Sequence, residues 1–314
     1  MHSFPCVPLL AALFGAATFV GAQQTTAAAP TLPAAPTKAV SVRLGKIYLN
    51  PDVHSTVVGD LRPGNDVAIL EQSHGFAHVF VQATGWIPDR GLVLLTDPNG
   101  AEVVFGAAAA LERRAESTGG GAAIARDAGR LYYRIYDDFP ASPRAGEALY
   151  RAADIGWQLD VRDLPVATDP SERRFPDTDL LRRVESKFSG TEWAARAAYT
   201  LLVTHFTCGE WLQKPKCVDK EADVYRDYLK KYPASPLYAQ ALYDLTYREA
   251  AGASVWAAEG PHRDQGKAAA RREAALADAA VLRQRFPNTD WSAQAALLTY
   301  QLQQGIPVYV KDAE

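Results

Sequence analysis

Residues 40–97 alternate short apolar runs with turn signals. Val67 and Ile69, and then Val79 and Val81, are apolar at every second position, which is the period of a strand with one buried face. Turns are indicated at Pro63-Gly64-Asn65, His74-Gly75 and Thr84-Gly85, where Gly or Asn allows a tight bend. The pattern predicts five short strands that form a small all-β barrel.

After the turn cluster Thr96–Gly100 the period changes. Ala and Leu dominate residues 101–314, and apolar residues recur at spacings of three and four, as on the buried face of an α-helix. Gly119-Gly120-Gly121 interrupts this pattern once. The sequence therefore predicts a second, all-α domain over residues 101–314.

Four related twelve-residue stretches lie within the predicted helical domain. They are FPASPRAGEALY, FSGTEWAARAAY, YPASPLYAQALY and FPNTDWSAQAAL, which begin at Phe139, Phe188, Tyr232 and Phe286. Each first aromatic residue is predicted to end one helix, and the Ser or Thr three residues later is predicted to cap the next one. The expected caps are Ser142, Thr191, Ser235 and Thr289, and Ala148, Ala197, Ala241 and Ala295 form a small-residue column for close helix packing.

The two domains resemble known families. Residues 40–97 are similar to a bacterial SH3-like (SH3b) domain in the Val57–Leu61 strand, the Gly64 turn and the Gly85-Trp86-Ile87 strand, with Phe76 where the family usually has Trp. Residues 122–304 resemble the tetratricopeptide-like (TPR-like) helical repeats of periplasmic Tol-Pal-associated and outer-membrane-assembly proteins. This resemblance implies a solenoid of stacked helical hairpins. The expected fold is thus a small all-β barrel followed by an all-α solenoid.

The N-terminus has the pattern of a secretory signal peptide over residues 1–22, with an apolar run from Leu9 to Val20. The alternative is a hydrophobic helix that is retained in the fold, because no Lys or Arg precedes the run. Residues 23–39, rich in Pro, Thr and Ala, are predicted to be a disordered linker. These features favour a secreted protein of the periplasm.

Secretion also bears on the cysteines. Cys208 and Cys217 are expected to form a disulfide in an oxidising compartment, and two free buried thiols are the alternative. Zinc is not favoured, because eight residues separate the pair. His74 and His78 lie in a predicted hairpin, too far apart along a strand to share a metal.

The composition of the chain argues against two classes of function. A net charge of -3 and no basic block argue against binding of nucleic acid. The apolar run from Leu9 to Val20 is too short to cross a bilayer, so no membrane span is expected. His205 lies three residues before Cys208, but no further catalytic motif accompanies them. We therefore predict a protein that is not an enzyme and that uses no cofactor.

Aromatic residues are the candidate ligand-binding groups. Tyr48, Phe76 and Trp86 form a predicted aromatic cleft in the barrel, although Trp86 fits a barrel core equally well. Trp193 and Trp291 lie on first helical turns, and Trp211 lies in the loop between the two cysteines. Residues of this kind are also common in helical cores.

The expected function is non-catalytic binding in the cell envelope. The solenoid would hold a protein partner, and the SH3-like domain would contact the peptide of the cell wall or a second protein. One alternative is a peptidoglycan-acting enzyme with an unrecognised active site. The other is a barrel that serves only as a structural cap on the helices.

Overall fold

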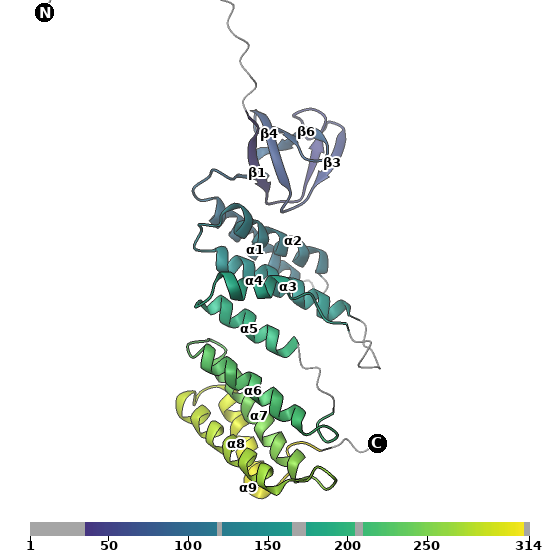
Figure 1. Ribbon diagram of the computed structural model, residues 1–314. Helices are drawn as coiled ribbons and strands as arrows, with labels where there is room; N and C mark the ends of the chain where they lie inside the picture. The colour runs from purple at the N-terminus through teal and green to yellow at the C-terminus, as the bar shows by residue number, and fades with distance from the viewer. Residues whose placement is uncertain (1–34, 118–120, 165–173, 205–209, 311–314) are drawn as a thin grey trace, which may run out of the picture. The chain divides into compact units, whose positions relative to one another are not determined.

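The computed structural model describes residues 35–117, 121–164, 174–204 and 210–310. The described sheet and helices all belong to one compact unit, Pro36–Glu314. The strands come first in the chain and the helices follow (Figure 1). This order agrees with a β domain followed by a helical domain.

The strands form one antiparallel sheet. In the described ranges there are seven of them, in the spatial order β3-β2-β6-β5-β4-β1-β7. Their bounds are β1 Thr37–Ser41, β2 Gly45–Tyr48, β3 Val57–Leu61, β4 Asp66–Ser73, β5 Phe76–Phe80, β6 Thr84–Pro88 and β7 Leu92–Leu94. The buried side chains of the sheet include Ile47, Ile69, Val79 and Ile87.

The sheet differs from the predicted five-stranded barrel. It has two more strands, and its edge strands β3 and β7 are not paired with each other, so it does not close and an SH3-like barrel is not confirmed. β1 begins at Thr37, inside the segment 23–39 that composition assigns to a linker. It is ordered by pairing with both β4 and β7, and such long-range pairing leaves no local signal in the sequence.

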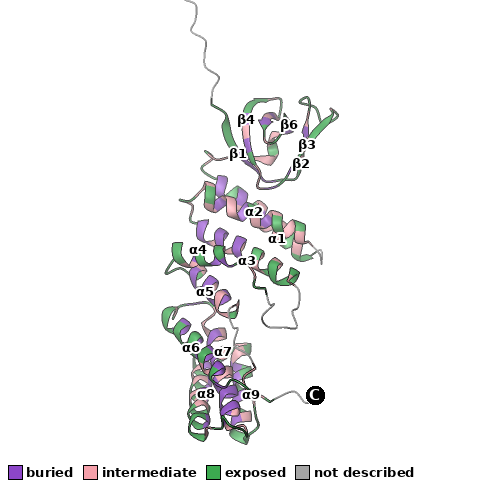
Figure 2. Ribbon diagram, turned by 45° about the vertical axis from the view of Figure 1, so that its right-hand side comes forward, coloured by how far each residue is buried: buried purple, intermediate pink, exposed green. Residues whose placement is uncertain are grey.

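The described part of the chain contains nine α-helices. Consecutive helices pack on one another, and α5 and α6 do so less extensively than the other pairs. Figure 2 shows buried residues concentrated between neighbouring helices. The bounds are α1 Gly100–Ser117, α2 Ala122–Asp138, α3 Ala145–Asp163, α4 Asp179–Lys187, α5 Glu192–Thr204, α6 Lys216–Lys231, α7 Tyr238–Ala257, α8 Gln265–Arg285 and α9 Asp290–Gln304.

The four repeated stretches are joints between successive helices, as predicted. Phe139, Phe188, Tyr232 and Phe286 each follow the last residue of a helix, at the ends of α2, α4, α6 and α8. The column Ala148, Ala197, Ala241 and Ala295 is fully buried. The residues seven and four places before each aromatic are also buried: Tyr132 and Ile135, Leu181 and Val184, Tyr225 and Tyr228, Ala279 and Leu282.

Two of the four predicted helix caps are confirmed and two are wrong. Thr191 and Thr289 accept hydrogen bonds from N–H groups three residues later, each at 3.3 Å. Ser142 and Ser235 instead accept from the N–H two residues later, at 3.2 and 3.0 Å. Each of these serines is followed by Pro, and the α-helix begins three residues after the serine, at Ala145 and Tyr238. In the two Ser-Pro copies a short turn thus separates the serine from the helix, so the serine is not the N-cap.

The sheet packs on the first helix. Val40, Val42 and Val93 of the sheet domain share a buried cluster with Val104 and Ala108 of α1. At Gly64, where φ is +84°, an added Cβ would lie 3.0 Å from the Cβ of Arg130 on α2. The glycine therefore permits both the turn and the close approach of α2.

Candidate functional site

Tyr48, Trp86 and His78 form a row across three neighbouring strands. Tyr48 on β2 is the register partner of Trp86 on β6, and Trp86 is the partner of His78 on β5. The Trp86 and His78 rings are stacked, with centroids 4.8 Å apart and planes 13° from parallel. We call these three residues the aromatic row. All three are half-buried, so each offers ring surface to solvent.

The row lies on the opposite face of the sheet from its core. Side chains alternate along a strand, and the neighbours Ile47, Ala77 and Ile87 are buried. Trp86 therefore lies on the face of the predicted aromatic cleft and not in the core of the sheet. Sequence reasoning missed His78 as a member of the row, although it is two residues from Phe76 in a period-two pattern.

Gly85 brings the row together. An added Cβ at this position would lie 2.6 Å from the side chain of Ile47 and 2.7 Å from the carbonyl oxygen of Tyr48. Only glycine allows β2 to approach β6 this closely, and the approach sets Tyr48 beside Trp86. The Gly-Trp-Ile pattern that suggested an SH3-like strand thus has a physical role.

Phe76 lies one step along the same face. It is half-buried, stands opposite Pro88 in the pairing of β5 with β6, and is separated by one residue from His78. Glu71 on β4 continues the row beyond His78, with 3.4 Å between the His78 Nδ1 and the Glu71 carboxylate. The predicted residues Tyr48, Phe76 and Trp86 are therefore brought to one surface.

Trp193 and Trp291 occupy equivalent positions in the helical joints. Trp193 packs on Tyr150 with 5.8 Å between ring centroids, and Trp291 packs on Tyr243 with 5.5 Å. In both pairs the Tyr ends one copy of the repeated stretch and the Trp belongs to the next copy. These two tryptophans are half-buried, and their contacts join successive copies.

Trp211 packs at the C-terminal part of the helical domain. Its indole N–H donates to Glu221 at 3.1 Å, and its ring lies 4.8 Å from that of Tyr309. Cys217 is buried at the start of α6. Cys208 lies outside the described residues, so the disulfide between the two cysteines stays a prediction.

A pocket of about 790 Å³ lies beside Tyr309. This volume is in the range of known ligand sites. α7, α8, the end of α9 and residues 305–310 form its walls. The apolar lining residues include Leu212, Ala253, Ala269, Leu276, Leu302 and Ile306.

The pocket also carries charges of both signs. Arg272 and Glu273 on α8 line the pocket and are exposed. Glu259, which follows α7, also lines the pocket. Tyr309 donates to Glu210 at 3.1 Å, and the backbone N–H of Val308 donates to Ser254 at 2.8 Å. These bonds hold the segment after α9 in place as one wall. The pocket was not predicted, because residues 212 and 253–310 come together only in the folded chain.

Among the residues that the structure describes, three ion pairs link α6 to α7 and α8. Arg248 pairs with Glu221 at 3.1 Å and Arg271 with Asp219 at 2.8 Å. In the third, Arg226 pairs with Glu249 at 2.8 Å.

Among the acids of these ion pairs, Glu249 has a strongly raised pKa. Its pKa is raised from 4.5 to about 7, mainly by burial and next by the neighbouring carboxylate of Asp278, while Arg226 acts in the opposite direction. Burial also raises the pKa of Asp278. Arg226 also pairs with Asp223, so one arginine serves three carboxyl groups, and the site favours retention of a proton on the pair of Glu249 and Asp278.

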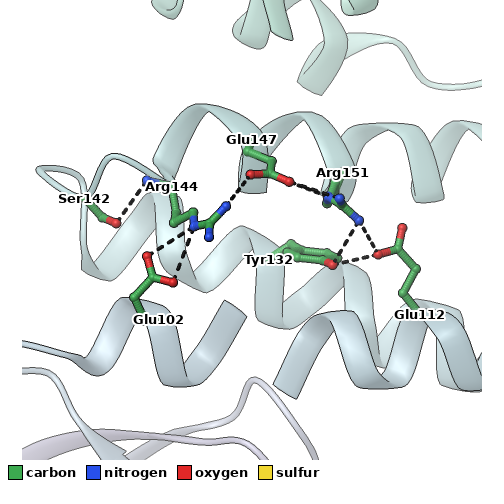
Figure 3. Close-up of polar contacts among 7 residues, drawn as sticks. All are labelled: Glu102, Glu112, Tyr132, Ser142, Arg144, Glu147 and Arg151. Atoms are coloured by element: carbon green, nitrogen blue, oxygen red, sulfur yellow. Dashed lines mark hydrogen bonds and ion pairs between the residues drawn. The ribbon is translucent and has the colours of Figure 1, made fainter. Parts of the chain in front are cut away.

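Arginines and carboxylates also link α1 to α3 (Figure 3). Arg144 donates to Glu102 at 3.1 Å and to Glu147 at 2.9 Å. Arg151 donates to the same Glu147 at 3.0 Å and to Glu112 at 2.7 Å. Each of these carboxylates accepts from an arginine. The network thus fastens the first helices together.

Tyr132 and Phe105 complete this network. Tyr132 on α2 donates to Glu112 at 2.6 Å, and burial together with that carboxylate raises the pKa of Tyr132. The Arg144 guanidinium lies 4.6 Å from the centroid of the Phe105 ring. A tyrosine with a raised pKa stays protonated at neutral pH, which suits a structural hydrogen-bond donor.

Comparison with known proteins gives no match, either to a protein-family model or to a curated protein. Within the described ranges, no three His, Cys, Asp or Glu side chains are grouped to hold a metal ion. None of the helices that the structure describes combines the length and apolarity needed to cross a bilayer.

The Glu249 and Asp278 pair predicts a pH dependence of stability. Because the folded-state pKa of Glu249 is raised above its ordinary value of 4.5 to about 7, the folded state binds more protons than the unfolded state between these pH values. This group therefore lowers the free energy of unfolding as pH rises from about 4.5 to about 7. Glu249→Gln should flatten that dependence, measured by urea unfolding across the pH range. An unchanged slope would show that Glu249 is not the titrating group. Glu273→Gln, at an exposed position of α8, is the matched control and should leave the slope as in the wild type.

Proposed function

We propose that the protein is a non-catalytic binding protein of the cell envelope, secreted to the periplasm. Its β domain is an SH3-like module that binds the peptide of the cell wall. Its helical domain is a TPR-like solenoid that holds a protein partner.

The aromatic row is the observation that carries the proposal. Three rings from three strands lie in register on the solvent face of the sheet, and Phe76 adjoins them. Aromatic faces offer large contact areas with little side-chain entropy to lose. A row of this kind suits an extended peptide that lies across the strands and stacks its apolar groups on the rings.

The sheet also covers α1, as in the structural-cap hypothesis. Three residues of the sheet domain pack on the helix. Val40 lies in β1, Val42 follows β1, and Val93 lies in β7. The aromatic row belongs to β2, β6 and β5. Covering the helix and binding a peptide therefore use different strands, and one domain can do both.

Binding of peptidoglycan tests this function. Trp86→Ala should weaken binding of the purified protein to isolated peptidoglycan sacculi by at least about tenfold, because a central aromatic contact contributes about 2 kcal/mol or more. Val53→Ala, at an exposed apolar residue outside the row, is the matched control and should bind as the wild type does. Co-sedimentation measures both.

Equal binding by wild type and Trp86→Ala would contradict the role of the row. The enzyme hypothesis predicts a different result, namely release of soluble muropeptides from the sacculi by the wild-type protein. Chromatography of the supernatant in the same experiment distinguishes turnover from binding.

The 790 Å³ pocket supports a second binding surface. Its apolar lining and its charges of both signs, Arg272 and Glu273, suit an apolar segment of a partner polypeptide, which supplies backbone dipoles and charged side chains beside apolar groups. This surface is the proposed site for the protein partner of the helical domain.

A photoreactive amino acid in place of Ala269, which lines the pocket, should cross-link the protein to another polypeptide in host cells. The same replacement at Ala280, an exposed alanine of α8 outside the pocket, is the matched control and should give little adduct. Denaturing gel electrophoresis measures the adducts. Equal yields at both positions would contradict a partner in the pocket.

A further inference from the structure

The second helix of each repeat presents three positions to the next repeat. They lie seven, eleven and fourteen residues after the first aromatic residue of the copy. In the first copy these are Gly146, Tyr150 and Ala153. An added Cβ at Gly146 would lie 2.9 Å from the Phe188 ring, and Tyr150 packs on Trp193. This face of α3 is therefore covered by the second copy.

The same positions are covered in the next two copies. In the second, Ala195 accepts a hydrogen bond from Tyr228 at 2.9 Å through its carbonyl oxygen, and Tyr199 packs on Tyr228 with 5.7 Å between ring centroids. In the third, Tyr243 packs on Trp291. Each of these second helices thus uses this face to contact the helical hairpin that follows.

The fourth copy has the same face, and no residue that the structure describes follows it as a further copy to cover that face. Its three positions are Ala293, Leu297 and Tyr300 on α9, the last helix of the described chain (Figure 1). All three are exposed, Leu297 at 60% and Tyr300 at 56%. In the earlier copies the residues at the Leu297 position are all tyrosines, and each is at least half-buried against the following copy.

The chemistry of this face favours contact with an identical face. Asp290 is the one charged residue between Asp290 and Gln304, and it lies at the start of the helix. The exposed residues beyond it are Ala293, Gln294, Ala296, Leu297, Tyr300, Gln303 and Gln304. Terminal units of repeat proteins ordinarily end in a polar face, and an exposed apolar patch marks an interaction surface. Two such neutral faces can meet without like-charge repulsion.

The other end of the helical domain limits how copies can join. α1 is covered there by Val40, Val42 and Val93 of the sheet domain. A head-to-tail stack would need that end to be open. The remaining arrangement places α9 of one copy on α9 of another, which is a closed two-fold contact.

We propose that α9 is the dimer interface of this protein. Two copies pack their α9 faces about a two-fold axis, with Leu297 and Tyr300 at its centre. The second copy takes the place that the following repeat takes in the first three copies. This interface is independent of the proposed peptide and partner sites.

Sedimentation velocity of the purified full-length secreted protein over a range of concentrations tests the interface. The wild type should be a dimer, and Leu297→Glu should raise the dissociation constant by at least about tenfold, because a buried charge at the centre of an interface has no partner. Val161→Glu, at an exposed apolar residue of α3, is the matched control and should remain dimeric. Circular dichroism shows whether each variant is folded.

A second variant tests the two-fold geometry even if Leu297→Glu fails to fold. Tyr300→Cys should form an intermolecular disulfide under mild oxidation, whereas Val161→Cys should not. A wild-type protein that is monomeric at the highest soluble concentration would overturn the proposal. So would a dimer that survives Leu297→Glu in a folded variant.

Discussion

A helical hairpin of this chain cannot bury its apolar side alone, and the rest of the helical domain follows from that constraint. Each hairpin joint places an aromatic residue at the end of one helix and a fully buried alanine in the next. The alanine column allows close approach. The Tyr that ends a copy packs on a Trp of the following copy in two junctions, and in the other junction Tyr199 packs on Tyr228 of α6, the helix that precedes the following copy. Each copy is thus covered by the next one, up to α9, the last helix of the described chain.

This constraint divides the aromatic residues by role. Trp193 and Trp291 are held in junctions between copies, so their ring surface already has a partner. The aromatic row of the sheet, Tyr48, Trp86 and His78, has solvent on one side. We propose that the residues in the sheet, and not those in the helical joints, receive the ligand.

Local patterns predicted the parts of the fold that depend on local physics. The helix-ending aromatics, the buried positions before them and the Thr caps all follow from short-range periodicity and hydrogen bonding. The Ser142 and Ser235 caps were wrong because a turn intervenes between each Ser-Pro and its helix. β1 and the C-terminal pocket were missed because they depend on pairing and packing between segments far apart in the sequence.

The candidate site follows the same division. Tyr48, Phe76 and Trp86 were chosen by residue type, and the register that sets them on one face comes from strand pairing around Gly85. The sequence alone shows His78 only as a strand histidine, because its stacking on Trp86 depends on that register. The buried pair of Glu249 and Asp278 left no sequence signal, because it joins two different helices.

The indole N–H resonances of the six tryptophans test most directly whether the sheet, and not the helical joints, receives the ligand. The measurement is a nuclear magnetic resonance titration of the labelled protein with a soluble muropeptide, with the Trp86 signal assigned from Trp86→Phe. The Trp86 signal should shift and saturate, while the signals of Trp193 and Trp291 stay in place. Shifts confined to Trp193 and Trp291, or no shift at Trp86, would contradict the assignment of the aromatic row as the binding surface.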